Sequence, residues 1–426
     1  MRFSFIHISD IHLGRPFSGL SEYSFDENIR NIYKNAVEKS FNNAINAAIE
    51  KSVDFVIISG DTFDSTEHDF SSKLVLKEAL NKLDSNGIKV FLICGNHDPL
   101  SSYNKNTFNY DENSDIKIIG LNTDYCTKLP VLNKNGQTEV LIHALSFKDK
   151  IFNENPIKYF ENLTEEERKY FNIGILHCDL DGDKTSIYAP CTRTELEDFN
   201  YDYWALGHIH IPSRDNSNIV YPGTIQGRNT KETGPHGIRY IQVENKNIIQ
   251  NTFIETNILR YEDLNIDVST AIDDTSCCQM ILDYISSIIT GQTCELYLLK
   301  INLSGCINFY DCINEDFFKN VSERINLEFN QKVHVSEFNN LLIPVADKEL
   351  LKNDDGISGE LYRASENSDL LNDTFEEVIS QLQKVIKNCC FSQDEYDTFK
   401  IKLINNVKEE CLNLCAKLYS GGNKEE

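Results

Sequence analysis

Five short clusters of polar residues carry the side chains that could do chemistry. Half of the ten histidines fall inside them, and each cluster follows or ends a short apolar run. The clusters are Asp10-Ile11-His12, Gly60-Asp61, Gly95-Asn96-His97-Asp98, His177 and Gly207-His208-Ile209-His210. Carboxylate and amide oxygens mixed with imidazole nitrogens suit Mn²⁺, Fe²⁺ or Zn²⁺ better than Ca²⁺ or a thiolate-bound metal. The residue types therefore predict a metal centre.

The spacing within the clusters indicates how they could act together. Asp10/His12 and His208/His210 are pairs separated by one residue, so the members of each pair point the same way from an extended chain. Asp61 is well placed for a bridging carboxylate. Two ions held roughly 3.5–4 Å apart can bridge a phosphate, activate a shared water and neutralise the charge of in-line displacement. His97, beside Asp98, could orient the phosphate or protonate the leaving group.

The elements around these clusters predict a layered α/β fold. Short apolar strands at residues 3–9, 54–59 and 89–94 alternate with helical stretches at 25–51 and 71–84. A βαβ-type sheet of this kind places ligands at the carboxyl ends of its strands. Further strands are expected at residues 140–144, 173–177, 203–206, 219–221 and 238–243, and Thr164 with Glu167 forms a capping box that predicts a helix before residue 173.

The character of the sequence changes near residue 259. Helices near residues 277–289 and 312–326 and strands near 295–303 and 332–337 predict a small α+β unit. Residues 353–359 have the composition of a loop, and two helical segments within 370–419, broken at 390–392, predict a hairpin. We therefore expect a catalytic domain at 1–258, a capping domain at 259–350, and a linker with a helical hairpin at 351–426.

The composition is that of a globular chain with a large acidic excess. With 40% hydrophobic and 25% charged residues, a wholly disordered or fibrous chain is excluded. The net charge is −25, of which −10 falls in the first 258 residues and −15 in the rest. Taken alone, that charge favours a soluble protein without general affinity for nucleic acid.

Several sequence features predict a cytoplasmic protein that does not cross a membrane. The chain has no run of 18 apolar residues, and its start lacks the apolar segment of a signal peptide. The 13 cysteines include no C-x-x-C pair, so they fit neither a zinc knuckle nor a disulfide framework. We interpret them as reduced cysteines.

The order of the five clusters resembles the signature of the calcineurin-like metallophosphoesterase superfamily, D-x-H, G-D, G-N-H-[DE], H and G-H-x-H. The resemblance implies a four-layer αββα sandwich with a two-metal site. It implies that Asp10, His12, Asp61 and His210 bind the first metal, and that Asp61, Asn96, His177 and His208 bind the second. It also implies that His97, with Asp98, acts on the scissile phosphate. No ligand of the pattern is missing.

Further motifs narrow the resemblance to the DNA repair exonuclease branch, which holds the SbcD nuclease and its YhaO-type bacterial relatives. They are Tyr203-Trp204-Ala205-Leu206-Gly207-His208-Ile209-His210, Tyr221-Pro222-Gly223-Thr224-Ile225-Gln226-Gly227-Arg228 and Lys231-Glu232-Thr233-Gly234-Pro235-His236-Gly237. This similarity implies a manganese-dependent nuclease that acts on DNA ends or hairpins, is a homodimer and works with an SbcC-like coiled-coil ATPase.

Alternatives remain open for several residues. His143 is a rival to His177 as a ligand, although the spacing favours His177, and His7 lies one residue off the Asp10/His12 face, which indicates a structural role. Arg15, Arg228 and Lys231 are candidate contacts to the DNA backbone, or else ordinary surface residues. The apolar positions of the C-terminal hairpin either pack on each other or bind a partner.

Two rival functions are consistent with the same motifs. One is a phosphoesterase acting on nucleotides or other small phosphodiesters. The other is a scaffold subunit of an ATPase complex whose metals are structural.

Overall fold

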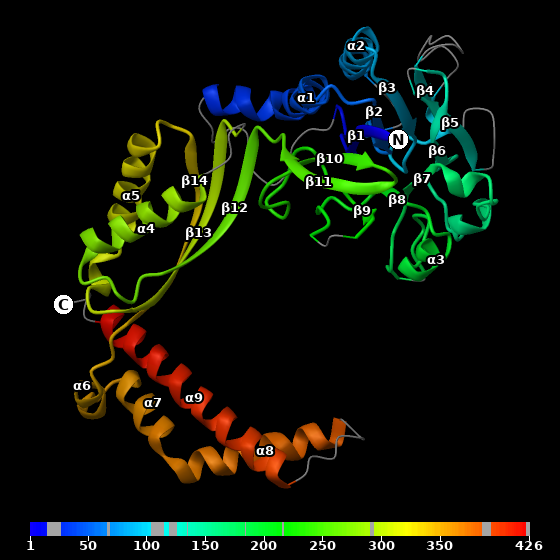
Figure 1. Cartoon of the computed structure of the whole chain (residues 1–426). Helices are drawn as coiled ribbons and strands as arrows, with labels where there is room; N and C mark the ends of the chain where they lie inside the picture. Colours follow the sequence, from blue (N-terminus) through cyan, green and yellow to red (C-terminus); the bar gives the residue numbers. More distant parts are fainter. Residues whose placement is uncertain are drawn as a thin grey trace. The chain divides into compact units, whose positions relative to one another are not determined.

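The protein is described here by a computed structural model, which divides into two compact units (Figure 1). The first unit is Met1–Glu262 with Thr290–Leu298, and the second is Asp263–Ile289 with Leu299–Glu426. The predicted domain boundaries near residues 258 and 350 stay predictions. The structure describes residues 1–14, 27–65, 69–103, 115–118, 126–133, 135–183, 185–214, 217–289, 294–385 and 393–422.

Two β-sheets form the centre of the first unit. The first sheet has the strand order β11-β10-β1-β2-β3-β4, and the second has the order β5-β6-β7-β8-β9. Strands β1 to β4 are parallel, as are β6 to β9, whereas β10 runs antiparallel to β1. The bounds in the first sheet are β1 (Arg2–Ile8), β2 (Phe55–Ser59), β3 (Lys89–Ile93), β4 (Ile116–Ile118), β10 (Gly237–Glu244) and β11 (Asn247–Glu255). Those in the second are β5 (Thr127–Leu132), β6 (Thr138–Leu145), β7 (Phe171–His177), β8 (Tyr203–Gly207) and β9 (Ile219–Val220).

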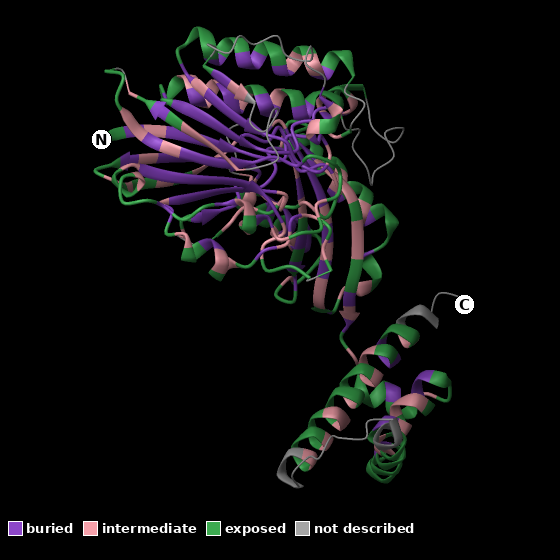
Figure 2. Ribbon diagram, turned by 90° about the vertical axis from the view of Figure 1, so that its right-hand side faces the viewer, coloured by how far each residue is buried: buried purple, intermediate pink, exposed green. Residues whose placement is uncertain are grey.

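Alternation along β1 shows why the two sheets stack. Phe3 and Phe5 face the core between the sheets, where they meet residues of β2, β6 and β7. Ile6 and Ile8 face the other side, where helices α1 (Glu27–Glu50) and α2 (Phe70–Ser85) cover the sheet. Since successive side chains of a strand point to opposite faces, one strand serves both layers. Figure 2 shows buried residues, in purple, along the strands of both sheets.

The outer face of the second sheet is covered by a thinner layer. Its core includes Phe160, Leu196 and Trp204, and the covering elements are short. They are the helix α3 (Arg193–Asp198) and the 3₁₀ turns η3 (Pro156–Tyr159) and η4 (Glu167–Lys169). The predicted four-layer αββα order is therefore confirmed, with a fourth layer made mostly of turns.

The helix predicted after Thr164 is wrong. The capping interactions do form, since Glu167 Oε2 accepts the Thr164 amide at 2.8 Å and Thr164 Oγ1 accepts the Glu167 amide at 3.3 Å. However, β7 begins already at Phe171, so the chain completes only the 3₁₀ turn η4. The sequence did not reveal β4, β5, β11, α3 or a further strand, β12 (Leu259–Asp267).

A three-stranded sheet in the order β12-β13-β14 leads into the second unit. Helices α4 and α5 accompany it, as the alternation of the sequence predicted. The bounds are β12 (Leu259–Asp267), β13 (Leu296–Ile307), β14 (Val333–Pro344), α4 (Asp274–Ile288) and α5 (Glu315–Glu328). Arg324 of α5 donates to the Gln279 side chain of α4 at 3.2 Å, which ties the two helices together.

Four helices end the second unit. They are α6 (Lys348–Asn353), α7 (Ile357–Glu366), α8 (Ser368–Val385) and α9 (Gln393–Gly422). The expected hairpin forms from α8 and α9, where the Phe375 ring meets Tyr396 and Lys400 pairs with Glu376 at 2.7 Å. The loop predicted at residues 353–359 covers only residues 354–356, because α6 and α7 lie on either side of it, and the sequence did not reveal these two helices. The break predicted at residues 390–392 lies outside the described residues. Within the described ranges, no helix has the length and apolar character needed to cross a bilayer.

His7 has a structural role, as its position off the Asp10/His12 face predicted. Its ring is buried between the sheets, with Nε2 2.8 Å from Ser59 Oγ and Nδ1 3.1 Å from the Tyr203 hydroxyl. Burial, aided by Arg239, lowers the pKa of His7 from 6.5 to about 3. Between these values the unfolded chain holds a proton at His7 and the folded chain does not.

The free energy of unfolding should therefore fall as the pH drops from 6.5 towards 3. His7 contributes about one proton to that slope, or about 1.4 kcal/mol per pH unit well inside the window. We expect His7→Gln, which cannot titrate, to show a shallower slope by that amount in urea unfolding at a series of pH values. Equal slopes for the two proteins would show that His7 does not titrate in this way.

Candidate metal centre

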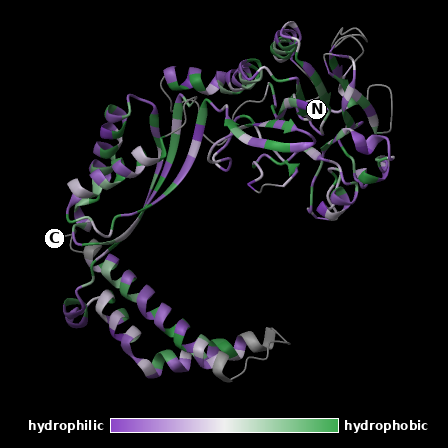
Figure 3. Cartoon of the chain, viewed as in Figure 1, coloured by the Kyte–Doolittle hydropathy of each residue, from purple (hydrophilic) through white to green (hydrophobic). Residues whose placement is uncertain are grey.

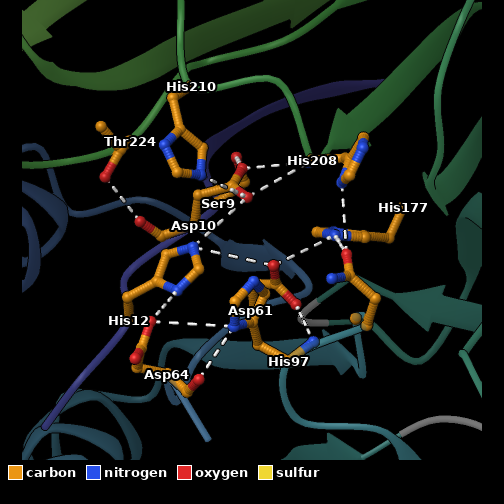
Figure 4. Close-up of polar contacts among 12 residues, drawn as sticks. Ser9, Asp10, His12, Asp61, Asp64, His97, His177, His208, His210 and Thr224 are labelled. Carbon is orange, nitrogen blue, oxygen red and sulfur yellow. Dashed lines mark hydrogen bonds and ion pairs between the residues drawn. The ribbon is translucent and has the colours of Figure 1, made fainter. Parts of the chain in front are cut away.

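The side chains of the five clusters meet at one edge of the first unit, where strands of both sheets end (Figure 4). Loops after β1, β2 and β3 supply one group, and β7 and the loop after β8 supply the other. The residues brought together are Asp10, His12, Asp61, Asn96, His97, His177, His208 and His210. The carboxyl ends of parallel strands converge at a common edge, which explains this meeting of distant segments.

One half of the cluster centres on Asp10. Its Oδ1 atom lies 3.9 Å from His12 Nε2 and 3.7 Å from His210 Nε2. These three residues offer ligand atoms within 4.8 Å of one another, which is close enough to hold one ion. Ser9 and the His208 backbone amide hydrogen-bond the same carboxylate and fix its orientation.

The other half contains Asn96, His177 and His208. Asn96 Oδ1 lies 3.1 Å from His177 Nε2 and 3.2 Å from His208 Nδ1. Asp61 stands between the two halves, because its Oδ2 atom is 3.4 Å from His177 Nε2 and 3.7 Å from His12 Nε2. This is the position that a bridging carboxylate requires. The assignment of the individual ligands stays a prediction.

The residues present fit divalent cations. His12 Nε2 is buried and has no hydrogen-bond partner among the described residues, although its other ring nitrogen is bonded. His177 donates from Nδ1 to the Ser59 carbonyl at 2.9 Å, which leaves Nε2 directed at the cluster. A metal-binding histidine is normally held in this way through its second nitrogen.

The electrostatics of the cluster also favour a cation. Burial alone would lower the pKa of His177, but the Asp61 and Asp10 carboxylates outweigh it and raise the pKa to about 10. The buried carboxylates therefore create an excess of negative charge at this point. A bound divalent ion can neutralise that charge.

The local backbone is strained where it presents these side chains. Asp10, His12, Asp61 and His208 have φ values of 51°, 50°, 49° and 106°. A residue other than glycine in this region costs of order 1–3 kcal/mol and persists only where its surroundings hold it, commonly at functional sites. Gly95 has a related role, since a Cβ there would lie 2.1 Å from Asp61 Oδ1.

His97 lies at the rim of the cluster. Its side chain is 37% exposed, its backbone amide donates to Asp61 Oδ1 at 2.9 Å, and Nδ1 donates to the Asp64 carbonyl at 2.8 Å. Nε2 is then the ring atom left for a substrate. An exposed imidazole beside buried ligands is suited to contact a phosphate or a leaving group.

Asp98, which we predicted to act with His97, is held by the backbone of the loops around it, and a catalytic role for it stays a prediction. Its carboxylate is buried and accepts hydrogen bonds from the backbone amides of Thr62, Phe63 and Gly95 and from the Tyr103 hydroxyl. None of these donors is a candidate ligand. Because Asp98 ties the loop after β2 to the loop after β3, its contacts are those of a residue that positions the site.

The three predicted DNA contacts have different outcomes. Arg228 is only 2% exposed and lies beside the candidate ligands, so it is not an ordinary surface residue, and its contact with DNA stays a prediction. Lys231 is exposed and remains a candidate contact. Arg15 lies outside the described residues.

His143, the rival of His177, is not part of the cluster. It is buried within the second sheet, where Nε2 lies 2.9 Å from Asn172 Oδ1. Its strand β6 continues to Leu145, two residues beyond His143, so the side chain does not reach the edge where the ligands meet.

Two carboxylates that the sequence reading did not single out support the ligands. Asp64 Oδ1 accepts a hydrogen bond from His12 Nδ1 at 3.0 Å, and Glu232 Oε1 accepts one from His210 Nδ1 at 2.9 Å. Such partners fix the ring orientation and the tautomer of a ligand. Asp64 follows Asp61 by three residues, and this closeness to a candidate ligand could have indicated its role. The residues around Glu232 give no such indication.

Comparison with known proteins identifies the class. Residues 3–212 match the family model of the calcineurin-like phosphoesterases. The chain is 32% identical over 292 residues to the protein named uncharacterized metallophosphoesterase YhaO of Bacillus subtilis, which covers 67% of this chain and 68% of that protein. The chain belongs to the calcineurin-like phosphoesterase family, whose members hydrolyse phosphoesters with divalent metals.

Two archaeal relatives carry the name DNA double-strand break repair protein Mre11. The protein from Methanocaldococcus jannaschii is 30% identical over 232 residues, covering 52% of this chain and 56% of that protein. The protein from Methanopyrus kandleri is 24% identical over 270 residues, covering 58% of this chain and 56% of that protein. These similarities support the resemblance to the DNA repair branch.

Proposed function

We propose that this chain is a two-metal phosphodiesterase that cuts DNA as an exonuclease or endonuclease in DNA repair, with manganese as the working metal. The observation that carries the proposal is that the candidate ligand side chains gather in one cluster, with Asp61 between its two halves and His97 exposed at the rim. A site that only had structural metals would not need an imidazole left open to solvent. The two relatives named for double-strand break repair support DNA as the substrate.

Each half of the cluster has its own part in this proposal. Bound divalent ions supply an activated water and neutralise charge on the phosphate. Asp10, His12 and His210 hold one ion, while Asn96, His177 and His208 hold the other, and Asp61 joins the two. His97 steadies the phosphate through Nε2 or protonates the leaving oxygen. Lys231 contacts the DNA backbone.

The acidity of the chain shapes how it would bind DNA. A net charge of −25 predicts weak affinity of the chain alone for a polyanion, because phosphate contacts need cations. We therefore propose that a partner, an SbcC-like coiled-coil ATPase, supplies much of the phosphate contact, and that the chain works in the cytoplasm as a homodimer. The net charge limits the affinity of the chain for DNA, whereas the side chains of the site determine which substrate is hydrolysed.

Helices α8 and α9 are the proposed surface for that partner. Both carry hydrophobic residues among hydrophilic ones (Figure 3). Val378, Phe399 and Ile401 are 43%, 41% and 62% exposed, so the pairing of α8 with α9 leaves apolar surface uncovered. Apolar side chains spaced along a helix are a common means of binding another helix.

The proposed substrate is tested by comparing polymers with small molecules. We expect the purified chain with Mn²⁺ to degrade linear duplex DNA, and Asn96→Ala to lose that activity. A panel of cyclic and linear nucleotides should be hydrolysed more slowly at equal phosphodiester concentration. If nucleotides are the better substrates and DNA is untouched with or without the ATPase, the chain is a small-molecule phosphoesterase.

Substitutions at the exposed apolar positions of α8 and α9 test the alternative that the chain is only a scaffold subunit. Val378→Asp combined with Ile401→Asp should leave hydrolysis of bis-p-nitrophenyl phosphate unchanged and abolish complex formation with the ATPase in size-exclusion chromatography. A wild-type chain that binds the ATPase but hydrolyses no phosphodiester in Mn²⁺ would support the scaffold function.

A further inference from the structure

A buried guanidinium lies beside a cluster that is built to hold cations. Arg228 is among the largest fully buried side chains of the described residues, and it follows β9 in the segment that leads to β10. A buried charge is costly unless other charges and hydrogen bonds compensate for it. A cation next to a metal position also repels the ion. The burial of Arg228 at this position therefore indicates that it has a specific role in the site.

The guanidinium lies between the two carboxylates that support the ligands. Arg228 Nη1 is 3.8 Å from Asp64 Oδ1, and Nη2 is 3.8 Å from Glu232 Oε1. The backbone amide of Arg228 donates to Glu232 Oε2 at 2.7 Å, which fixes the second oxygen of that side chain. One arginine thus holds carboxylates that come from loops 168 residues apart in the sequence.

These two carboxylates orient two histidines of the same half of the cluster. Asp64 accepts from His12 and Glu232 accepts from His210, at 3.0 and 2.9 Å. Both histidines direct Nε2 at Asp10. Arg228 therefore reaches His12 through Asp64, and it reaches His210 both through Glu232 and directly, since Nη2 lies 3.3 Å from His210 Nδ1. These contacts lie along one side of a single candidate metal position.

The histidines of the other half are held by different groups. His177 donates to the Ser59 carbonyl, and His208 lies against Asn96. Neither contact involves Arg228, Asp64 or Glu232. A change at Arg228 should for that reason act on one half of the cluster and spare the other.

We propose that Arg228 is a positioning residue which couples the orientations of His12 and His210, through Asp64, through Glu232 and through its own contact with the His210 ring, and so sets the affinity of that one metal position. The inference rests on the proposed ligand assignment. A guanidinium suits this task because its planar fork can face two carboxylates at once, whereas an ammonium group is a point charge on a flexible stem.

The test is metal binding by the full chain, measured by isothermal titration of the metal-free protein with Mn²⁺. We expect the wild type to bind two ions. In Arg228→Met, one ion should bind with unchanged affinity and the other about 10–100-fold more weakly, which is the usual effect of losing a partner of a ligand. Arg228→Lys should restore only part of this loss, since the charge returns without the fork.

A kinetic measurement separates positioning from contact with the substrate. The Mn²⁺ concentration that gives half-maximal hydrolysis of bis-p-nitrophenyl phosphate should rise by the same factor in Arg228→Met. At saturating Mn²⁺, kcat should return to within about 3-fold of the wild-type value, because a loss of metal affinity is overcome by mass action.

Glu167→Gln is the matched control. Glu167 is a carboxylate 17% exposed that pairs with Lys128 at 3.0 Å, much as Glu232 is 14% exposed and lies near Arg228. It precedes β7, at the end of that strand away from the ligands. Glu167→Gln removes one negative charge, as Glu232→Gln does, and should leave both Mn²⁺ affinities unchanged.

Three outcomes would overturn the inference. They are unchanged affinity at both positions in Arg228→Met, equal weakening at both, or a loss of kcat that saturating Mn²⁺ does not restore. If Arg228→Met does not fold, Glu232→Gln decides, since it should weaken the same single position. A wild type that binds no Mn²⁺ would refute the proposed function itself, whereas two ions bound equally well by wild type and variants would refute only the role of Arg228.

Discussion

Asp61→Asn is expected to lower kcat/KM for bis-p-nitrophenyl phosphate by more than about 100-fold. Loss of a residue that only supports a metal ligand already costs up to about 100-fold, and Asp61 is itself a candidate ligand. Asp61 lies within 3.4 and 3.7 Å of histidines from both halves of the cluster. Although burial opposes ionisation, His177 and His12 hold the pKa of Asp61 well below its usual range. An amide keeps the shape of the side chain and its hydrogen bond from His97, but removes the charge that joins the two halves.

The measurement is steady-state hydrolysis over a series of Mn²⁺ concentrations, together with a Mn²⁺ titration of the metal-free protein. Asp202→Asn serves as the control, because Asp202 precedes β8 at the end of the strand away from the ligands, where it accepts the Asn172 amide and pairs with Lys246. Activity of Asp61→Asn within a few-fold of wild type, with two ions bound, would show that Asp61 does not bridge.

His97→Ala is expected to reduce kcat on DNA by about 10²–10⁴-fold, the range that a positioned acid or base contributes. Mn²⁺ binding should stay near the wild-type value, since His97 is at the rim and holds its contacts through Nδ1 and the backbone. His143→Gln is the matched control: that histidine is buried in the second sheet, bonded to Asn172 and remote from the ligands.

The two possible roles of His97 give different results with different leaving groups. If His97 protonates the leaving oxygen, its loss should slow DNA cleavage far more than hydrolysis of bis-p-nitrophenyl phosphate, because p-nitrophenolate leaves without a proton. If it steadies the phosphate, both substrates should slow equally. A variant with normal kcat on both substrates would remove His97 from the catalytic step.

The candidate ligands could be found from the sequence because each follows a short apolar strand. A strand that ends in polar residues marks an edge of a sheet, and parallel strands bring such edges together. The inward orientation of Asp98 could not be predicted in this way. Asp98 adjoins His97 in sequence, yet it turns inward and accepts amides from Thr62, Phe63 and Gly95, because neighbouring residues of a turn point in different directions.

The supporting residues could not be predicted because they act across distant segments. Nothing in the sequence around Arg228 indicates that its side chain is buried, and an arginine after a strand is more often exposed. Its burial follows from two carboxylates, one of which, Asp64, lies in another loop. The short strand β4 was not predicted for a similar reason, since it is too short for an alternating pattern and is fixed by pairing with β3.

A two-metal site that cuts DNA should show a high value of one ratio of rate constants. It is kcat/KM for linear duplex DNA divided by kcat/KM for bis-p-nitrophenyl phosphate, measured in Mn²⁺ with and without the ATPase partner. We predict a ratio above one that rises further with the partner, and loss of both activities in Asp61→Asn. Hydrolysis of bis-p-nitrophenyl phosphate without any cleavage of DNA, alone or with the partner, would contradict the claim.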